Sequence, residues 1–327
     1  MERAADKRRL SIFNFKQENH KENSILAGKI LLFLFFAFLF FNHVEPQYEG
    51  SFNASLIDKT ERLKSIEGAK IVLLGNSNLV FGIDSAMIEQ ELGIPVVNMG
   101  LHGGLGNAFH ERMAEFNIQK GDIYILCHSS YADDDSIDNA ELAWITIENH
   151  FELWKLLRWK DMLNMAKGFP AYLRKTIDIC SAASGNVDTG NIYSRSAFNK
   201  YGDCGIEREG STYTELGGVS APTVNSIAAR RINCLNKRLK SQGATLLIAG
   251  YPIGMGEKTD NKEKFITFQA ELEENLECPV ISDYVDYMYD YSYFYDYNYL
   301  HLNSEGAVLR TRQLISDLER WLADNEK

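Results

Sequence analysis

The chain has 327 residues, of which 45% are hydrophobic and 24% are charged, so it can bury a sizeable core, and we expect one large domain with appendages. Its formal net charge of -11 argues against a nucleic-acid partner, because phosphate binding needs clustered Lys and Arg. Small molecules or neutral polymers suit this charge better.

A long apolar run follows a polar N-terminal tail, residues 1–24, which we expect to be cytoplasmic. Residues 25–44 provide about 20 positions, enough for roughly 30 Å of helix and one bilayer crossing. The run is too long for a signal peptide and lacks its cleavage site, so we predict an uncleaved transmembrane helix in the cell membrane, with a buried core helix as the alternative. Basic residues before it and acidic residues after it place the main domain outside the cytoplasm. Residues 45–67 are interpreted as a polar stalk that can include a short helix.

Short apolar runs alternate with helical patterns from residue 68 to the end of the chain. The runs with strand character are KIVLLG, PVVNMG, DIYILCHS, ATLLIAG and CPVISDY. The helical patterns cover 84–92, 106–119, 223–242, 260–275 and 304–325. This order predicts an α/β fold with a parallel sheet and helices on both faces.

Such sheets bind ligands beyond the carboxyl ends of their strands. Residues 75–78, 100–106 and 129–135 would therefore share one edge of the sheet. Residues 136–222 interrupt the alternation with a helical pattern and a loop rich in Gly, Ser and Asn. This insertion either covers the cleft or is a surface elaboration.

The five cysteines show no C-x-x-C spacing and no neighbouring pair of histidines, which argues against a zinc site. We expect no metal and no organic cofactor. Cys180 and Cys204 bracket a loop and are a candidate disulfide pair.

Three motifs carry the chemistry. Ser77 ends the first strand at a turn, where unpaired N–H groups can stabilise an oxyanion. The sequence NMGLHGGLGN supplies Gly100 and Gly103, whose backbone can approach a substrate closely. His301 stands just before a predicted helix. A serine, a glycine-rich loop and a late histidine are the parts that acyl transfer needs, although each alone also fits a turn or a helix start.

The blocks LLGNSN, NMGLHGG and HLNSEG resemble the first, second and last sequence blocks of the SGNH/GDSL hydrolase superfamily, over residues 70–325 apart from the insertion. The chain looks most similar to membrane-anchored members that accompany membrane-bound O-acyltransferases in modifying cell-envelope polymers. The resemblance implies a flavodoxin-like sheet, Ser77 as nucleophile and His301 as general base. It also implies oxyanion donors from Ser77 and from Gly100 or Gly103.

The chain departs from the family pattern at two places. The position of the usual Asp, three residues before the histidine, is Asn298, and an amide cannot stabilise an imidazolium as a carboxylate does. We therefore prefer Asp296 as the third catalytic residue and keep Asn298 as the alternative. The family's Gly-x-Asn-Asp block is replaced by CHSSYADDD, so one side-chain oxyanion donor is missing or is supplied from elsewhere.

Further residues are expected to line the substrate site. Residues 284–299 include a tyrosine at every second position from Tyr287, and in an extended chain these rings would form one face suited to sugars. Packing of the rings against the insertion or against the membrane-proximal surface is the alternative. The candidate substrate contacts are Asn76, Asn78, His102, Tyr297 and Tyr299.

The expected function is a serine-dependent hydrolase or transferase of acyl groups, with acetyl preferred, that acts on a cell-envelope carbohydrate. A catalytically silent domain that binds a glycan and docks onto a membrane-bound O-acyltransferase is the main alternative. A phosphate-binding module fits less well, because the chain has no Walker lysine after its first strand.

Overall fold

A computed structural model describes residues 24–33, 35, 36, 39, 48–132, 136–148, 150–181, 190–210, 218–296 and 300–325. The chain divides into two compact units, Met1–Pro46 and Gln47–Lys327, and each is considered by itself.

In the first unit, residues 24–33 are helical, and their large apolar side chains, such as Leu31 and Phe33, are exposed. Across the residues described here, no helix is both long enough and apolar enough to cross a membrane. The predicted span at 25–44 lies partly outside the described residues, so the transmembrane helix stays a prediction.

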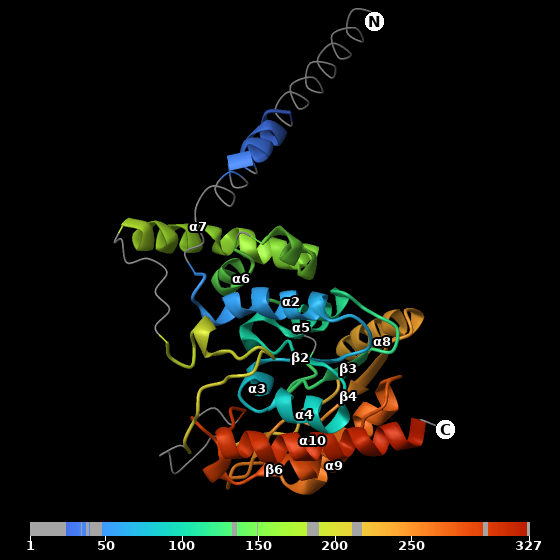
Figure 1. The fold of residues 1–327 in the computed structure, drawn as a ribbon. Helices are drawn as coiled ribbons and strands as arrows, with labels where there is room; N and C mark the ends of the chain where they lie inside the picture. Colours follow the sequence, from blue (N-terminus) through green and yellow to red (C-terminus); the bar gives the residue numbers. More distant parts are fainter. Residues whose placement is uncertain are drawn as a thin grey trace, which may run out of the picture. The chain divides into compact units, whose positions relative to one another are not determined.

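The second unit is built on a parallel sheet of four strands in the order β2-β1-β3-β4 (Figure 1). Ile71 of β1 is in register with Val96 of β2 and Ile123 of β3. The predicted fifth run makes a single parallel bridge, from Val280 to Ile248. The strands are β1 (Ile71–Leu74), β2 (Val96–Asn98), β3 (Ile123–Leu126) and β4 (Thr245–Ile248), with a separate parallel pair of β5 (Ile253–Gly254) and β6 (Met288–Tyr289).

Helices cover both faces of this sheet, as predicted for a mixed α/β fold. In Figure 1, α4 and α10 lie below the sheet and α2, α5 and α8 lie above it. Their bounds are α2 (Ser55–Ser65), α3 (Ser77–Val80), α4 (Ser85–Leu92), α5 (Asn107–Arg112), α8 (Ser226–Ser241), α9 (Lys262–Asn275) and α10 (Ser304–Asn325). The strands are buried on both faces because their apolar side chains pack on these helices, which explains why they read as continuous apolar runs.

The predicted helix at 106–119 is shorter than its pattern. The α-helix ends at Arg112 and continues only as a 3-10 turn over Met113–Glu115. The cause lies just beyond, at Asn117, which adopts a positive φ of 48°. Asn117 holds this conformation because its side-chain amide donates to the Leu63 carbonyl at 2.9 Å.

The segment interpreted as a stalk contains α2, which is part of the folded unit. Leu56 and Leu63 are fully buried on one face of the helix, and Lys59 between them is 2% exposed. Apolar residues seven positions apart lie on the same helix face, so this face packs against the domain. The short helix is therefore present at residues 55–65, but it belongs to the folded unit, and the stalk interpretation is corrected there.

The insertion forms the helices that its pattern predicts. These are α6 (Ala140–Ile147) and α7 (Trp159–Ser181), with a 3-10 helix over Phe151–Leu156 between them. Figure 1 shows α7 lying across α6. The Trp144 indole N–H donates to the Met165 carbonyl at 2.7 Å. Cys204 is a free, buried thiol, so the candidate disulfide with Cys180 is not formed.

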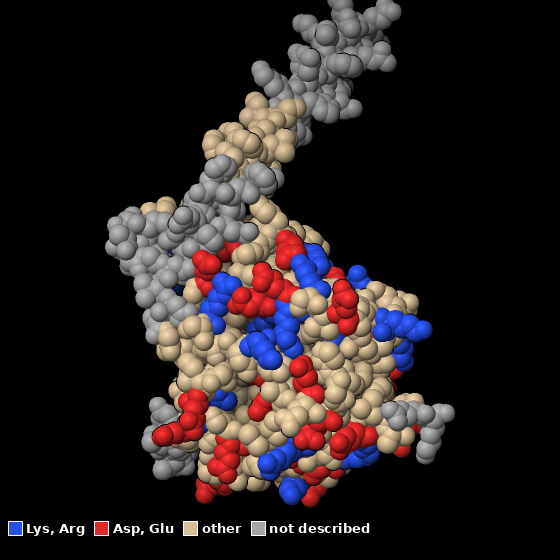
Figure 2. Space-filling model, in the orientation of Figure 1, with Lys and Arg blue, Asp and Glu red and all other residues tan. Residues whose placement is uncertain are grey.

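Acidic and basic side chains lie side by side over much of the face shown in Figure 2. Mixed charge of this kind agrees with an acidic protein that has no continuous basic surface for phosphates there.

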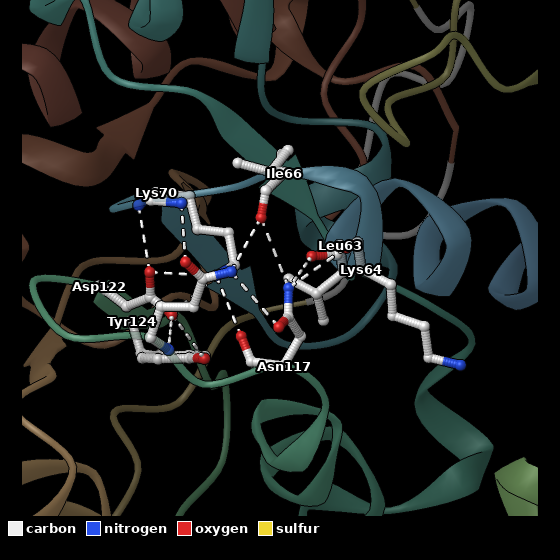
Figure 3. A network of polar contacts seen from close by, with 9 residues as sticks. Leu63, Lys64, Ile66, Lys70, Asn117, Asp122 and Tyr124 are labelled. Atoms are coloured by element: carbon white, nitrogen blue, oxygen red, sulfur yellow. Dashed lines mark hydrogen bonds and ion pairs between the residues drawn. The ribbon is translucent and has the colours of Figure 1, made fainter.

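A buried ion pair joins the start of β1 to the start of β3, at the amino end of the sheet (Figure 3). The Lys70 Nζ lies 2.8 Å from Asp122 Oδ2, and both side chains are 0% exposed. The same carboxylate oxygen accepts the Gln119 N–H at 2.8 Å and the Tyr124 hydroxyl at 3.2 Å, while the Asn117 carbonyl accepts from Lys70 at 3.0 Å. These bonds satisfy the two charges where water cannot reach them.

We expect Asp122→Asn to lower the free energy of unfolding by about 3–5 kcal/mol, because it leaves a buried ammonium without a counter-charge. Urea unfolding would measure the loss. Glu152→Gln is the control, since it breaks the exposed pair with Lys64 and should cost less than about 1 kcal/mol. Equal losses in the two variants would contradict the prediction.

Candidate active site

Ser77 lies where β1 ends and α3 begins. A Cβ at Gly75, before the turn, would come within 3.1 Å of the Cys127 carbonyl oxygen, so the chain turns where a side chain has no room. Asn76 caps the helix, since its Oδ1 accepts the Asn78 N–H at 3.0 Å. The Ser77 N–H stands at the first helical position and donates to no described residue, which leaves it available to an oxyanion.

His301 comes from the far end of the chain and reaches Ser77. Its Nε2 lies 2.8 Å from the Ser77 hydroxyl oxygen, across 224 sequence positions. The imidazole is buried and packs on the Phe81 ring at a centroid distance of 4.6 Å. A hydroxyl is activated when a base lies within hydrogen-bond reach, so these two residues stand in the relation that acyl transfer requires.

Asp296 completes a relay with the histidine. Its Oδ2 lies 3.0 Å from His301 Nδ1. This contact assigns the ring proton to Nδ1, so the Nε2 lone pair accepts from the Ser77 hydroxyl. Asp296 is preferred to Asn298 because a carboxylate stabilises an imidazolium better than an amide does, and the structure places the Asp296 carboxylate on the ring. Asn298, Tyr297 and Tyr299 lie outside the described residues.

A short antiparallel pairing presents Asp296 to the histidine. Phe294 and Leu302 form a bridge, and the Tyr295 N–H donates to the His301 carbonyl at 2.9 Å. The chain therefore reverses direction between Asp296 and His301. This bend places the Asp296 carboxylate beside the imidazole ring.

Gly100 and Gly103, the alternative oxyanion donors, have different surroundings. The Gly100 N–H donates to Asn98 Oδ1 at 2.8 Å, so this amide is already occupied and cannot serve as the donor. The Gly103 N–H has no acceptor within the described part of the chain. A Cβ at Gly103 would lie 3.6 Å from the Asn76 Cβ, so this glycine borders the turn that carries Ser77. Gly103 is therefore the better candidate.

Asn76 and Asn78, both expected to contact substrate, also have different surroundings. Asn78 is fully buried, and its Oδ1 accepts from Arg310 Nη2 at 2.9 Å inside the protein. Its predicted substrate contact is wrong, because the side chain points into the core. Asn76 is half-buried, and its amide donates to Ser129 Oγ at 3.1 Å. An amide group thus borders the site, although the family's usual asparagine is missing.

His102 stands on the glycine loop and is exposed. Its Nδ1 accepts the Gly104 N–H at 3.0 Å, which assigns the proton of the neutral ring to Nε2. Partial desolvation and, secondly, the nearby charge of His301 lower the pKa of His102. Both effects favour a neutral ring that can donate from Nε2 beside the candidate site.

The tyrosine-rich segment does not form one extended face. Residues 284–287 and 291–293 are 3-10 turns on either side of the two-residue strand β6. Tyr284, Tyr287 and Tyr289 are buried. Turns break the predicted alternation, and Tyr287 and Tyr289 pack in a buried cluster with Phe294 and Leu302 instead of forming a face for sugars.

Lys59 binds the glycine loop, residues 100–106, from inside the protein. The sequence pattern did not identify this residue as part of the site. Its buried ammonium donates to the carbonyls of Asn98 at 3.0 Å, Gly100 at 2.7 Å and Gly202 at 2.6 Å. Burial lowers the pKa of Lys59 to about 7, against the opposing charges of Asp203 and Asp58. A lysine on the apolar face between Leu56 and Leu63 was the sequence signal for this role.

Asn98 and Asp203 extend this buried cluster. The Asn98 side chain donates to Asp203 Oδ1 at 2.8 Å and to the Leu79 carbonyl at 2.9 Å. Asp203 also accepts the N–H and hydroxyl of Ser85 at 2.8 and 2.7 Å. Burial raises the pKa of Asp203, while its hydrogen bonds and then Lys59 oppose the rise. The cluster joins α2, α3, α4, the glycine loop and the insertion.

The loop of the insertion also touches the relay itself. The Tyr193 hydroxyl donates to Asp296 Oδ2 at 3.4 Å, and its ring packs edge-on against Phe81. The buried Arg208 donates to the Leu302 carbonyl at 3.2 Å and to the Phe81 carbonyl at 3.1 Å. The insertion is therefore more than a surface elaboration, because it contacts both sides of His301.

Comparison of the chain with models of protein families, with curated proteins and with solved structures finds no match. Within the described ranges, no group of three or more His, Cys, Asp or Glu side chains is placed to hold a metal ion. The resemblance to the SGNH hydrolases therefore stays a prediction.

Two glycine variants test the packing of the loop. We expect Gly100→Ala to cost about 1–3 kcal/mol of unfolding free energy, because its Cβ would lie 2.8 Å from the Leu79 Cβ. Gly103→Ala has room and should change stability by less than about 0.5 kcal/mol. Chemical denaturation of both variants measures the difference, and similar losses would contradict this description of the loop.

The lowered pKa of Lys59 predicts a pH-dependent stability. Its folded pKa of about 7 lies below the ordinary 10.5, so the unfolded state binds more protons between these values. The free energy of unfolding should therefore rise with pH, by up to about 1.4 kcal/mol per pH unit.

Unfolding between about pH 7 and 8 checks this prediction, since this range lies below the ordinary thiol pKa of about 8.5. Lys59→Met should remove most of the rise, whereas Lys64→Met, at an exposed position of the same helix, should retain it. The same slope in all three proteins would show that Lys59 keeps its ordinary pKa.

Proposed function

We propose that the protein is a serine-dependent hydrolase or transferase of ester-linked acyl groups. The observation that carries this proposal is the continuous relay from the Ser77 hydroxyl through His301 to Asp296, with contacts of 2.8 and 3.0 Å. Each residue has the partner that its role requires: a hydroxyl on a base, and a base on a carboxylate.

The reaction would proceed in two halves. Ser77 Oγ attacks the ester carbonyl carbon while His301 Nε2 takes the hydroxyl proton, and the N–H groups of Ser77 and Gly103 hold the oxyanion. Collapse of the tetrahedral intermediate breaks the ester bond, and His301 returns the proton to the leaving alcohol. Water or a second hydroxyl then attacks the acyl-serine with His301 again as base, which gives hydrolysis or transfer. Asp296 stabilises the imidazolium in both halves.

The proposed substrate is an acetyl ester or related acyl ester on a cell-envelope carbohydrate. The resemblance to membrane-anchored SGNH proteins and the predicted membrane span at 25–44 support this choice. Both features also support an extracytoplasmic site with a membrane-bound O-acyltransferase as partner. Tyr297, Tyr299, Asn76 and the neutral His102 remain candidates for sugar contacts.

A catalytically silent glycan-binding domain is the second candidate. The replacement of the usual asparagine block by CHSSYADDD favours it, because a side-chain donor to the oxyanion is absent from that motif. Such a domain would bind the polymer and dock onto the acyltransferase without forming an acyl-serine.

Fluorophosphonate labelling of the purified full-length chain tests the proposal. We expect an adduct at Ser77 that Ser77→Ala abolishes and that His301→Gln slows by about 10³-fold or more. Asp296→Asn should slow labelling strongly and Asn298→Ala only slightly, which decides between the two candidates for the third residue. Rates of adduct formation and peptide mapping measure these effects.

Ser130→Ala is the control, because this exposed serine lies on the same rim and should not affect labelling. A folded wild-type chain that forms no adduct, or a His301→Gln variant that labels at the wild-type rate, would favour the silent glycan-binding domain.

A further inference from the structure

The outer side of α7 carries an exposed apolar stripe. Trp159 is 73% exposed, Leu163 51% and Ile177 52%, although all three are large apolar side chains. Their spacings of four and fourteen positions place them on one line along the helix. Ala166 and Pro170, both exposed, continue the same line. Large exposed apolar surfaces of this kind mark interaction sites.

The opposite side of α7 is already buried. Met165, Phe169 and Tyr172 pack into the domain, and the rings of Phe169 and Tyr172 lie against Trp144 of α6. The helix is therefore apolar on two sides, and packing within the described part of the chain accounts for only one of them. The outer stripe needs a separate explanation.

Basic residues border the stripe. Lys160, Lys167 and Arg174 follow one another at intervals of seven, so they form a row along one flank of the apolar line, and all three are exposed. This row is unusual in a chain with a net charge of -11. An apolar stripe with a tryptophan and a flanking row of cations is the pattern of a helix that lies in the surface of an anionic bilayer.

The folded unit begins beside this helix. Tyr48 is the first described residue of the second unit, and its ring lies 6.0 Å from Tyr172 on α7, while its N–H donates to Glu148 at 3.0 Å. The described part of the folded unit therefore begins against the helix that carries the stripe.

We propose that α7 lies on an anionic lipid bilayer, with Trp159, Leu163 and Ile177 among the acyl chains next to the headgroups and with Lys160, Lys167 and Arg174 on lipid phosphates. Lipid is favoured over a protein partner because the stripe lies on one continuous helix and carries a tryptophan, and because three of the four exposed charged residues along its flank, Lys160, Lys167 and Arg174, are basic, with Asp178 the fourth. This inference does not depend on the serine chemistry.

Tryptophan quenching in bilayers tests it with the full-length chain. The protein would be reconstituted into nanodiscs of neutral lipid or of neutral lipid mixed with phosphatidylglycerol, with and without bromine on the acyl chains. The emission of Trp159 is the difference between the wild type and Trp159→Phe. We expect this emission to be blue-shifted and lost to brominated lipid, most strongly in the anionic nanodiscs.

Two variants provide the controls. Trp321, partly buried against the core on α10, should contribute the same emission with and without bromine, as Trp321→Phe would show. Changing Lys160, Lys167 and Arg174 together to Gln should remove the preference for anionic lipid. Trp159 emission that bromine leaves unchanged in both lipids would overturn the proposal, and so would shielding of Trp159 that depends on self-association or on an added acyltransferase.

Discussion

The ammonium of Lys59 is the interaction on which the arrangement of the candidate site depends. It binds carbonyl groups of the end of β2, of the glycine loop and of the insertion at once. Carbonyl oxygens enclose this cation, and one buried carboxylate, Asp203, lies nearby. The ammonium is fully hydrogen-bonded only when all of these segments are in place, so it couples their positions. The loop that carries Gly103 is thereby positioned from inside the protein and needs no substrate to order it.

The two ends of the sheet differ: the amino end carries a buried ion pair, and the carboxyl end carries the candidate site. The Lys70–Asp122 pair closes the amino end, where its bonds go to backbone and side chains of the scaffold alone. At the carboxyl end, polar groups such as the Ser77 N–H and the His102 ring lack a complete set of partners among the described residues. Parallel sheets make this division possible because all strands end at the same edge. Residues of the insertion, Tyr193 and Arg208, then complete the edge from outside.

Much of this arrangement could be predicted from the sequence, because its signals were local. The strands read as buried apolar runs, and Ser77 and His301 followed from their motifs. Asp296 needed only the argument that a carboxylate stabilises an imidazolium better than Asn298 can. Lys59, Arg310 and Tyr193 were missed because their roles come from distant segments. The hydrogen bond that occupies the Gly100 N–H could not be predicted either. Its acceptor, the Asn98 side chain, belongs to the same motif, and the sequence does not show that this side chain points toward the loop.

Ser77 and His301 are separated by 224 positions, and this separation determines when their contact can form during synthesis. During synthesis Ser77 is made 224 positions before His301, so a nascent chain that ends before His301 cannot contain a hydroxyl activated by it. The insertion, which touches both Lys59 and Asp296, is made between the two. The contact between Ser77 and His301 forms only after the loop that carries His301 has folded back onto the end of the first strand.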